Sequence, residues 1–197
     1  PSFTSTPVTT GCVSGLYSYD ITATDPDLPY GDAIEIVATG LPSWLTLSDN
    51  GDGTATLSGT PPAIGTYSIT LAVEDLAHHA HAPVEQTFDI HVYGPPSISG
   101  CPQTQYQQIY AGANCNQTFT YNPTVTSAIS YALSHKFTGA TTDSSSGSGS
   151  GAAFNTGQTT VTVYATNACG TSSCSFVVTV IDTVKPNVVT KNITVYL

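Results

Sequence analysis

The stretch LPSWLTLSDNGDGTATLSGTP, residues 41–61, contains two short runs in which apolar and polar residues alternate, Trp44–Leu47 and Thr54–Leu57. They are joined by Asn-Gly-Asp-Gly, whose residues tolerate positive φ angles and therefore close β-hairpins. The stretch predicts a β-hairpin. Because an isolated hairpin is only marginally stable in water, we expect this one to lie in a larger sheet with its apolar side chains facing a core.

The same two-residue alternation fills the rest of the first half of the chain. Glycine, proline, aspartate or asparagine bounds each run, and no run has the helical period. With an initial strand predicted at Phe3–Val8, about seven strands result, which is the size of an immunoglobulin-like β-sandwich. The other runs are Tyr17–Thr24, Ile34–Ile36, Tyr67–Glu74 and Phe88–Val92.

The composition excludes some classes of partner. The 197 residues carry a net charge of -10 with three lysines and no arginine, and only 8% of them are charged. Nucleic acids and anionic membrane surfaces require clustered cations, so we expect no nucleic-acid partner, and divalent cations are the natural electrostatic partner. No stretch approaches the roughly 20 apolar residues of a membrane span, so no membrane insertion is expected. This profile is typical of secreted or extracellular all-β modules.

The pattern breaks at residues 93–96, Tyr-Gly-Pro-Pro, and alternation restarts at Ser97. We predict one domain over residues 1–93, a linker over 94–96 and a second domain over 97–182. Residues 183–197 are expected to be a linker and the first strand of a next module, so that the chain is a piece of a longer secreted protein. The Ser- and Gly-rich residues 138–153 are expected to form a mobile connection.

Two family resemblances support this division. The order YSYDITATDPD, LPSWLTLSDNGDGTATLSGTP, GTYSITLAVED and QTFDIHV resembles the bacterial immunoglobulin-type (He_PIG-like) and dystroglycan-type cadherin-like modules. GPPSISGCP, AAFNTGQTTVTVYATN and SCSFVVTVID resemble the hyalin-repeat (HYR) module, although Asn167 stands where that family usually has an aspartate. The resemblance implies an all-β fold of two tandem immunoglobulin-like β-sandwiches plus a C-terminal strand of a following module, as in large Bacteroidetes surface adhesins.

Aspartates follow two strands that run parallel in such a sandwich, so their loops are expected to meet at one rim. Like charges that crowd together repel one another unless a cation bridges them, and a divalent ion with oxygen ligands is the usual solution. Residue by residue, Asp25 and Asp27 match the cadherin DxD pair and Asp75 matches the aspartate that ends the AxD run, which implies calcium (Ca²⁺) as a cofactor. The alternative is that these aspartates only close turns.

The five cysteines lack CxxC spacing, which favours disulfides in an oxidising compartment. The hyalin-repeat resemblance pairs Cys101 with Cys174, which leaves Cys115 with Cys169. The rival pairing of Cys101 with Cys115 and Cys169 with Cys174 remains open from the sequence. Cys12 is then left over, either as a buried thiol or as a partner for a cysteine outside the chain.

No catalytic constellation is recognisable, so we expect a protein that is not an enzyme. The first hypothesis is a non-catalytic structural or adhesive stalk of a large secreted or cell-surface protein, whose partners are neighbouring modules of the same polypeptide and extracellular glycans or proteins. The alternative is a carbohydrate-binding or spacer module of a secreted polysaccharide-active enzyme, with Tyr30, Tyr106, Tyr110 and Tyr131 as stacking candidates. A third hypothesis is that residues 187–197 pair with a strand edge of another chain in a fibre.

Overall fold

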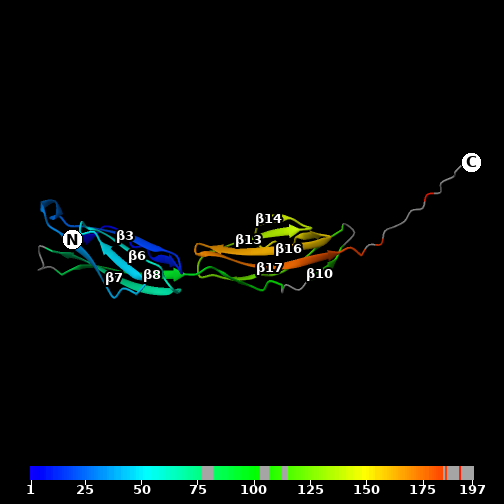
Figure 1. The fold of residues 1–197 in the computed structure, drawn as a ribbon, viewed down its shortest axis with the longest axis horizontal. Coiled ribbons are helices and arrows are strands. Elements are labelled where there is room, and N and C mark those ends of the chain that lie inside the picture. The colour runs from blue at the N-terminus through cyan, green and yellow to red at the C-terminus, as the bar shows by residue number, and fades with distance from the viewer. Residues whose placement is uncertain (77–81, 103–106, 112–114, 184, 186–190, 192–197) are drawn as a thin grey trace, which may run out of the picture. The chain divides into compact units, whose positions relative to one another are not determined.

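The computed structural model describes residues 1–76, 82–102, 107–111, 115–183, 185 and 191 (Figure 1). Apart from one 3-10 turn, Leu28–Tyr30 (η1), the regular elements of these residues are β-strands, which confirms the all-β prediction. No helix in the described part of the chain is long and apolar enough to cross a membrane. The expected next-module strand and the fibre hypothesis fall on residues that lie mostly outside the described ranges.

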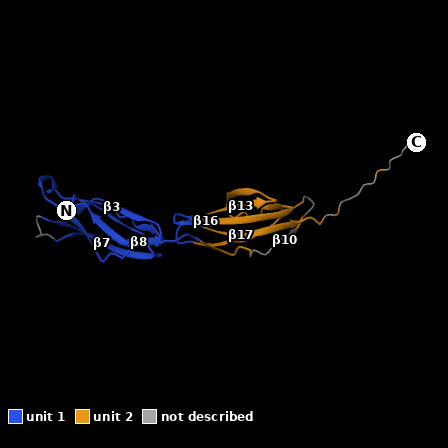
Figure 2. Ribbon diagram, in the orientation of Figure 1, with its two compact units in different colours: residues 1–96, 127–131, 166–171 blue, residues 97–126, 132–165, 172–197 orange. Residues whose placement is uncertain are grey.

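The chain forms two compact units (Figure 2). Unit 1 comprises residues 1–96, 127–131 and 166–171, and unit 2 comprises residues 97–126, 132–165 and 172–197. Each unit has its own hydrophobic core. Short segments from the second half of the chain thus belong to unit 1, which the alternation pattern does not indicate.

Unit 1 contains two four-stranded sheets, in the orders β1-β3-β6-β5 and β2-β8-β7-β4. Alternate side chains of their central strands are buried, as the burial pattern of β3 shows most clearly, so the alternation read from the sequence is the core pattern. The strands are β1 (Ser2–Phe3), β2 (Thr10–Cys12), β3 (Tyr17–Thr24), β4 (Ile34–Thr39), β5 (Leu45–Asp49), β6 (Thr54–Gly59), β7 (Gly65–Asp75) and β8 (Val84–Tyr93).

The first strand differs from the prediction. Instead of one strand over Phe3–Val8, β1 pairs with β3 antiparallel and β2 pairs with β8 parallel, so the chain changes sheets between them. Pro7 lies in this interval. Proline has no backbone N–H to donate to a ladder, which explains why the first strand is interrupted here.

The hairpin predicted for residues 41–61 is present. Strands β5 and β6 pair from Leu45–Gly59 to Asp49–Ala55, and the Asn50 N–H donates to the Thr54 carbonyl at 3.0 Å. Gly53 has φ 82°, and its carbonyl accepts the Ala23 N–H at 2.8 Å, which brings the hairpin turn to the end of β3.

Unit 2 is built on a five-stranded sheet, β10-β17-β16-β13-β14, with the pairs β11-β15 and β12-β9. Its core contains four buried aromatic residues, Tyr121, Phe137, Phe154 and Phe176. The strands are β9 (Ser97–Ser99), β10 (Gln107–Tyr110), β11 (Asn116–Thr118), β12 (Thr124–Thr126), β13 (Ala132–Gly139), β14 (Asp143–Ser146), β15 (Ala153–Asn155), β16 (Gly157–Asn167) and β17 (Gly170–Ile181).

The expectation of a mobile connection over residues 138–153 is wrong, because β14 and the start of β15 lie within it. The serines of β14 pair with β13 through their backbones, for which their exposed side chains are not needed. Gly149 has φ 76°, and a Cβ there would clash with the rings of His135 and Phe137. Gly149 therefore allows the close packing of this segment rather than giving it freedom.

The disulfides correct two expectations, the pairing of Cys115 with Cys169 and the prediction that Cys12 pairs with no cysteine of this chain. Cys101 is bonded to Cys174, whereas Cys169 is bonded to Cys12, and Cys115 is a free, exposed thiol. The Cys115 carbonyl accepts the Thr156 N–H, just before β16 begins, whereas Cys169 follows the end of that 11-residue strand. An extended strand of this length spans about 35 Å, while a disulfide requires Cα atoms within about 7 Å.

Candidate functional site

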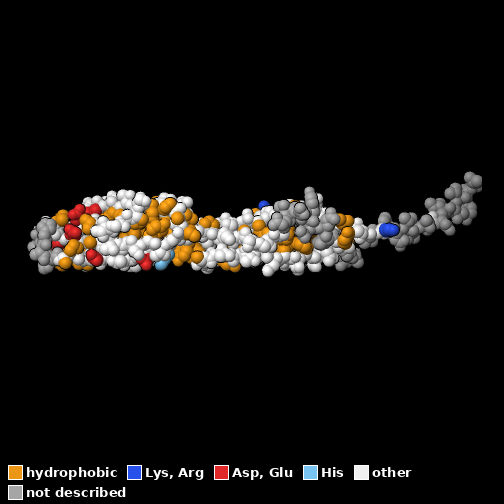
Figure 3. Space-filling model, turned by 90° about the horizontal axis from the view of Figure 1, so that it is seen from below, with side chains coloured by type: hydrophobic (Ala, Val, Ile, Leu, Met, Phe, Trp, Pro, Cys, Tyr) orange, Lys and Arg blue, Asp and Glu red, His pale blue; other side chains and the backbone are white. Residues whose placement is uncertain are grey.

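Three aspartates form an acidic cluster in unit 1. Asp25, Asp27 and Asp32 each offer a carboxylate oxygen, and these atoms lie within 4.8 Å of one another. All three belong to the connection between β3 and β4, which contains η1 and reverses at Gly31, where φ is 95°. In Figure 3, acidic side chains gather at the end of unit 1.

Hydrogen bonds with the local backbone orient two of these carboxylates, those of Asp25 and Asp32. The Asp27 N–H donates to Asp25 Oδ1 at 2.9 Å, and the Ala33 N–H donates to Asp32 Oδ1 at 2.7 Å. Asp25 is buried, and its Oδ2 forms an ion pair with the amino group of Pro1. The arrangement combines the turn-closing role of aspartates with an accumulation of negative charge that attracts a cation.

Asp75 lies at the same end of unit 1 but is not a member of the acidic cluster. It pairs in register with Ile34, and the following Leu76 N–H donates to the Ala33 carbonyl at 2.9 Å. Asp32, which was not among the site residues predicted from the sequence, takes the third place in the acidic cluster. Its position two residues before the predicted strand Ile34–Ile36 is the signal that could have identified it.

The donor set of the acidic cluster fits a calcium ion. Calcium binds oxygen ligands at 2.3–2.6 Å, so two ligand atoms on one ion lie at most about 5 Å apart. The 4.8 Å limit within the acidic cluster meets this condition. Asp25, Asp27 and Asp32 would hold the ion, and its charge would neutralise their mutual repulsion.

The aspartate of the hairpin turn is engaged in a different way. Asp52 Oδ1 accepts the Thr54 N–H at 3.0 Å and the Thr54 hydroxyl at 2.6 Å. These hydrogen bonds from Thr54 lower the pKa of the Asp52 carboxyl. Asp52 therefore closes the hairpin turn through hydrogen bonds with Thr54, a common role of aspartates.

Asn167 lies at the turn between β16 and β17, and its hydrogen bonds attach this turn to other residues of unit 1. Its amide nitrogen donates to the Gly94 carbonyl at 2.9 Å and lies 3.2 Å from Ser127 Oγ, and its oxygen accepts the Cys169 N–H at 2.8 Å. An ionised aspartate has no hydrogen to donate to the Gly94 carbonyl. This explains in physical terms why an amide suits this position.

His135, Asp143 and Ser145 of unit 2 lie together but do not form a catalytic arrangement. His135 Nε2 faces both Asp143 Oδ2 at 3.0 Å and Ser145 Oγ at 3.4 Å, while Nδ1 faces the Gly147 carbonyl at 3.1 Å. In a catalytic triad the acid and the nucleophile occupy opposite ring nitrogens. The buried His135 instead fastens β13 to β14 and to the turn that follows.

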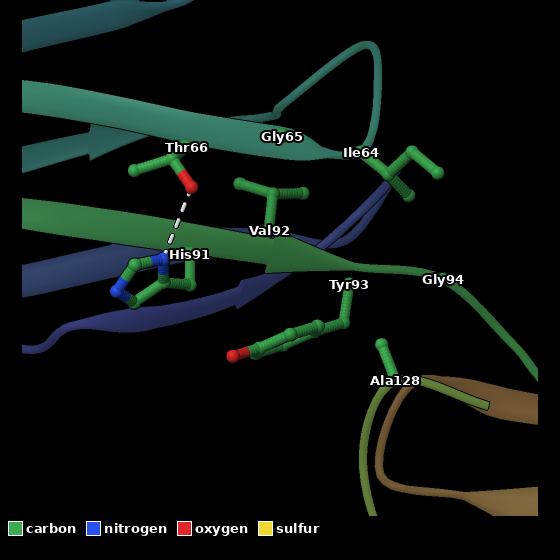
Figure 4. Close-up of a pocket in the computed structure, with 8 residues that line it drawn as sticks. All are labelled: Ile64, Gly65, Thr66, His91, Val92, Tyr93, Gly94 and Ala128. Atoms are coloured by element: carbon green, nitrogen blue, oxygen red, sulfur yellow. Dashed lines mark hydrogen bonds between the residues drawn. The ribbon is translucent and has the colours of Figure 1, made fainter.

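A groove of about 410 Å³ in unit 1 is lined by Ile64, Gly65, Thr66, His91, Val92, Tyr93, Gly94 and Ala128 (Figure 4). His91 Nδ1 lies 3.1 Å from the Thr66 hydroxyl, and the rings of His91 and Tyr93 are 6.5 Å apart. The groove thus combines aromatic and aliphatic surface with a few polar groups.

Of the tyrosines considered for glycan stacking, Tyr30, Tyr110 and Tyr131 are exposed, and none of them lines this groove. Tyr106 lies outside the described residues. Trp44 packs edge-on against Tyr17 and Tyr67 at the core.

Comparison with known proteins identifies the fold. Residues 1–93 match the family model He_PIG, described as "Putative Ig domain". A search of the curated proteins finds no match to the chain.

Among solved structures, the chain is similar to the N-terminal eight Ig domains of the Down Syndrome Cell Adhesion Molecule, with 15% identity and a TM-score of 0.50, over 87% of this chain and 23% of that one. The chain is also similar to the I67-I69 fragment of the titin I-band, with 13% identity and a TM-score of 0.46, over 91% of this chain and 64% of that one. Its likeness to an endo-fucoidan hydrolase of glycoside hydrolase family 107 has 17% identity and a TM-score of 0.34, over 90% of this chain and 28% of that one.

The chain spans less than two thirds of the length of each of these three structures. At such identities the likeness concerns the fold alone. The chain therefore contains an immunoglobulin-like module at residues 1–93, within an all-β architecture of tandem immunoglobulin-like sandwiches.

Proposed function

We propose that the chain is a non-catalytic structural or adhesive part of a large secreted or cell-surface protein. The observation that carries the proposal is the pair of immunoglobulin-like units, each with its own core and each containing a disulfide. Disulfides persist in oxidising environments, which favours an extracellular setting. The hyalin-repeat character of residues 97–182 and a bacterial adhesin context belong to the same proposal.

Calcium at the acidic cluster is the second element of the proposal. Binding would tie the β3–β4 connection to the end of β3 and reduce the motion of this end of unit 1. Extracellular calcium modules commonly have dissociation constants on the order of 0.1–1 mM, so we expect an affinity in that range.

Isothermal titration with calcium tests this element. The chain is compared with a version that carries a Gly-Ser extension before Pro1, because the extension moves the amino group away from Asp25. We expect heat of binding and a raised melting temperature in the extended version, and loss of both in Asp32→Asn. Asp89→Asn changes an exposed carboxylate on β8 and is the matched control that keeps binding. Absence of heat and of any melting shift in the extended version would remove calcium from the proposal.

A glycan-binding role is the second candidate, and the groove beside Tyr93 favours it. Sugar rings stack on aromatic faces and need a few polar partners, which His91 and Thr66 supply next to Tyr93. A glycan array probed with the whole chain tests this role. Binding that is lost in Tyr93→Ala and kept in Tyr30→Ala would support it, whereas an array without any bound glycan would exclude it for the glycans tested.

A further inference from the structure

Two disulfides create covalent shortcuts along the chain. Cys12–Cys169 joins residues 157 positions apart, and Cys101–Cys174 joins residues 73 positions apart. The shortest covalent path through the chain follows residues 1–12, crosses the Cys12–Cys169 bond and continues along residues 169–197. This path leaves out residues 13–168, which include most strands of both units.

We propose that the Cys12–Cys169 bond is a tension bypass, which carries a pulling force past residues 13–168 so that they are not extended. A covalent bond withstands forces that separate hydrogen-bonded strands, so the shortest covalent path bears the load. The biological meaning of the bypass depends on the proposed structural role, whereas the bypass itself follows from the connectivity of the chain.

Both anchor points of the bypass are held within unit 1. Cys12 is the last residue of β2, where it pairs in register with Tyr93, and the next residue, Val13, donates its N–H to the Tyr93 carbonyl at 2.8 Å. The Cys169 N–H is bonded to the side chain of Asn167, which also donates to the Gly94 carbonyl. The bond thus joins two segments that other interactions already place together.

The strand on the exit side of the bypass is already extended. After Cys169 the path runs along β17 (Gly170–Ile181), a 12-residue strand. An extended strand lengthens little under tension, because its rise per residue is already about 3.3 Å. On the entry side, residues 1–12 contribute only the short strands β1 and β2.

Stretching single molecules of the whole chain by handles at residues 1 and 197 tests the bypass. With the bond intact, the protein part extends to at most about 150 Å, because only residues 1–12 and 169–197 lengthen at up to about 3.6 Å per residue. Cys12→Ser/Cys169→Ser leaves the path along residues 1–101 and 174–197, so the limit rises about threefold, to about 450 Å.

Two control variants isolate the Cys12–Cys169 bond. The variant Cys101→Ser/Cys174→Ser also removes one disulfide. Because the Cys101–Cys174 bond lies outside the shortest path, the maximal extension of this variant stays at about 150 Å. Cys115→Ser leaves the limit unchanged for the same reason. Dithiothreitol reduces both disulfides, each taking two electrons and two protons as the dithiol closes to its own cyclic disulfide, and the limit then rises to about 700 Å.

The measured extension distinguishes a Cys12–Cys169 bond from a Cys115–Cys169 bond. An unmodified chain that extends to about 450 Å would overturn the proposal, since a Cys115–Cys169 bond would give that limit. The limit depends on covalent connectivity alone, so it remains interpretable if a variant fails to fold. A failed bypass leaves the calcium and glycan experiments untouched, and negative results in those experiments leave the bypass standing.

Discussion

At the scale of single residues, Gly59 shows how a local contact selects one amino acid. It pairs with Leu45 on one side and Tyr17 on the other, at the end of the central strand β6. A Cβ at this position would overlap the carbonyl oxygen of Trp44. The glycine in the run LSGTP therefore serves close backbone packing rather than a turn conformation.

Replacing Gly59 by alanine should destabilise unit 1. The new methyl group forces the backbone of Trp44 aside, and overpacking of this kind costs up to about 3 kcal/mol of the free energy of unfolding. Urea denaturation followed by Trp44 fluorescence measures the change. Ser58→Ala, one position earlier on the same strand, is the control and should change stability by less than about 1 kcal/mol. Equal stability of the two variants would contradict the packing argument.

Asn167→Asp should lower stability in a pH-dependent manner. At pH 7 a carboxylate cannot donate to the Gly94 carbonyl, and leaving this partly buried group without its donor costs up to about 3 kcal/mol. A protonated carboxyl can donate, so the loss should shrink as the pH approaches 3. Thermal melts of this variant and of a control variant at an exposed position, Asn122→Asp, provide the comparison at both pH values. A loss that is constant with pH would contradict the donor role of Asn167.

At the scale of elements, alternation predicted strands whose alternate side chains are buried, such as β3, and missed the exposed strand β14. Strand β3 was predicted with its observed bounds, because every second residue contributes to the core. Strand β14 is fully exposed and rich in serine, so its sequence carries no burial signal. Its place is set by the backbone of β13 and by His135, which only the folded chain brings within hydrogen-bonding distance.

The β13–β14 hairpin should contribute stability that acid removes. The hydrogen bond with His135 lowers the pKa of Asp143 most, and the hydrogen bond from the Ser144 N–H lowers it further. A carboxyl whose pKa is lower in the folded state stabilises fully above its unfolded pKa of about 3.9 and loses this contribution as the pH falls through the folded pKa.

Asp143→Asn should therefore flatten the decline of melting temperature between about pH 5 and pH 2. The effect should vanish when Asp143→Asn is introduced into a His135→Gln background, since the partner is then absent. An unchanged pH profile in the single variant would show that the pair does not stabilise the hairpin.

At the scale of the whole molecule, the sequence predicted two sandwiches but not how distant residues meet. The pairing of Cys12 with Cys169 depends on unit 1 taking in residues 166–171, a tertiary arrangement without a local signal. Asp32 likewise joins Asp25 and Asp27 only because the β3–β4 connection folds back at Gly31. Composition and alternation report burial, whereas these contacts arise from the path of the chain.

The two disulfides should contribute comparably to stability. By the chain-entropy estimate, removing Cys101–Cys174 lowers the free energy of unfolding by about 4 kcal/mol and removing Cys12–Cys169 by about 5 kcal/mol. Guanidinium denaturation of the two double serine variants measures both losses. Cys115→Ser is the control and should remain within about 0.5 kcal/mol of the unmodified chain, because its thiol is exposed and unbonded.

The parallel pairing of β2 with β8 gives unit 1 a particular resistance to mechanical rupture once the Cys12–Cys169 bond is absent. Pulling the start of β2 and the end of β8 in opposite directions shears this pair, so its hydrogen bonds share the load and fail together instead of unzipping one by one. The parallel pair of β10 with β17 lies outside this load path, because the Cys101–Cys174 bond bypasses residues 102–173. Unit 1 should therefore yield in a single abrupt event.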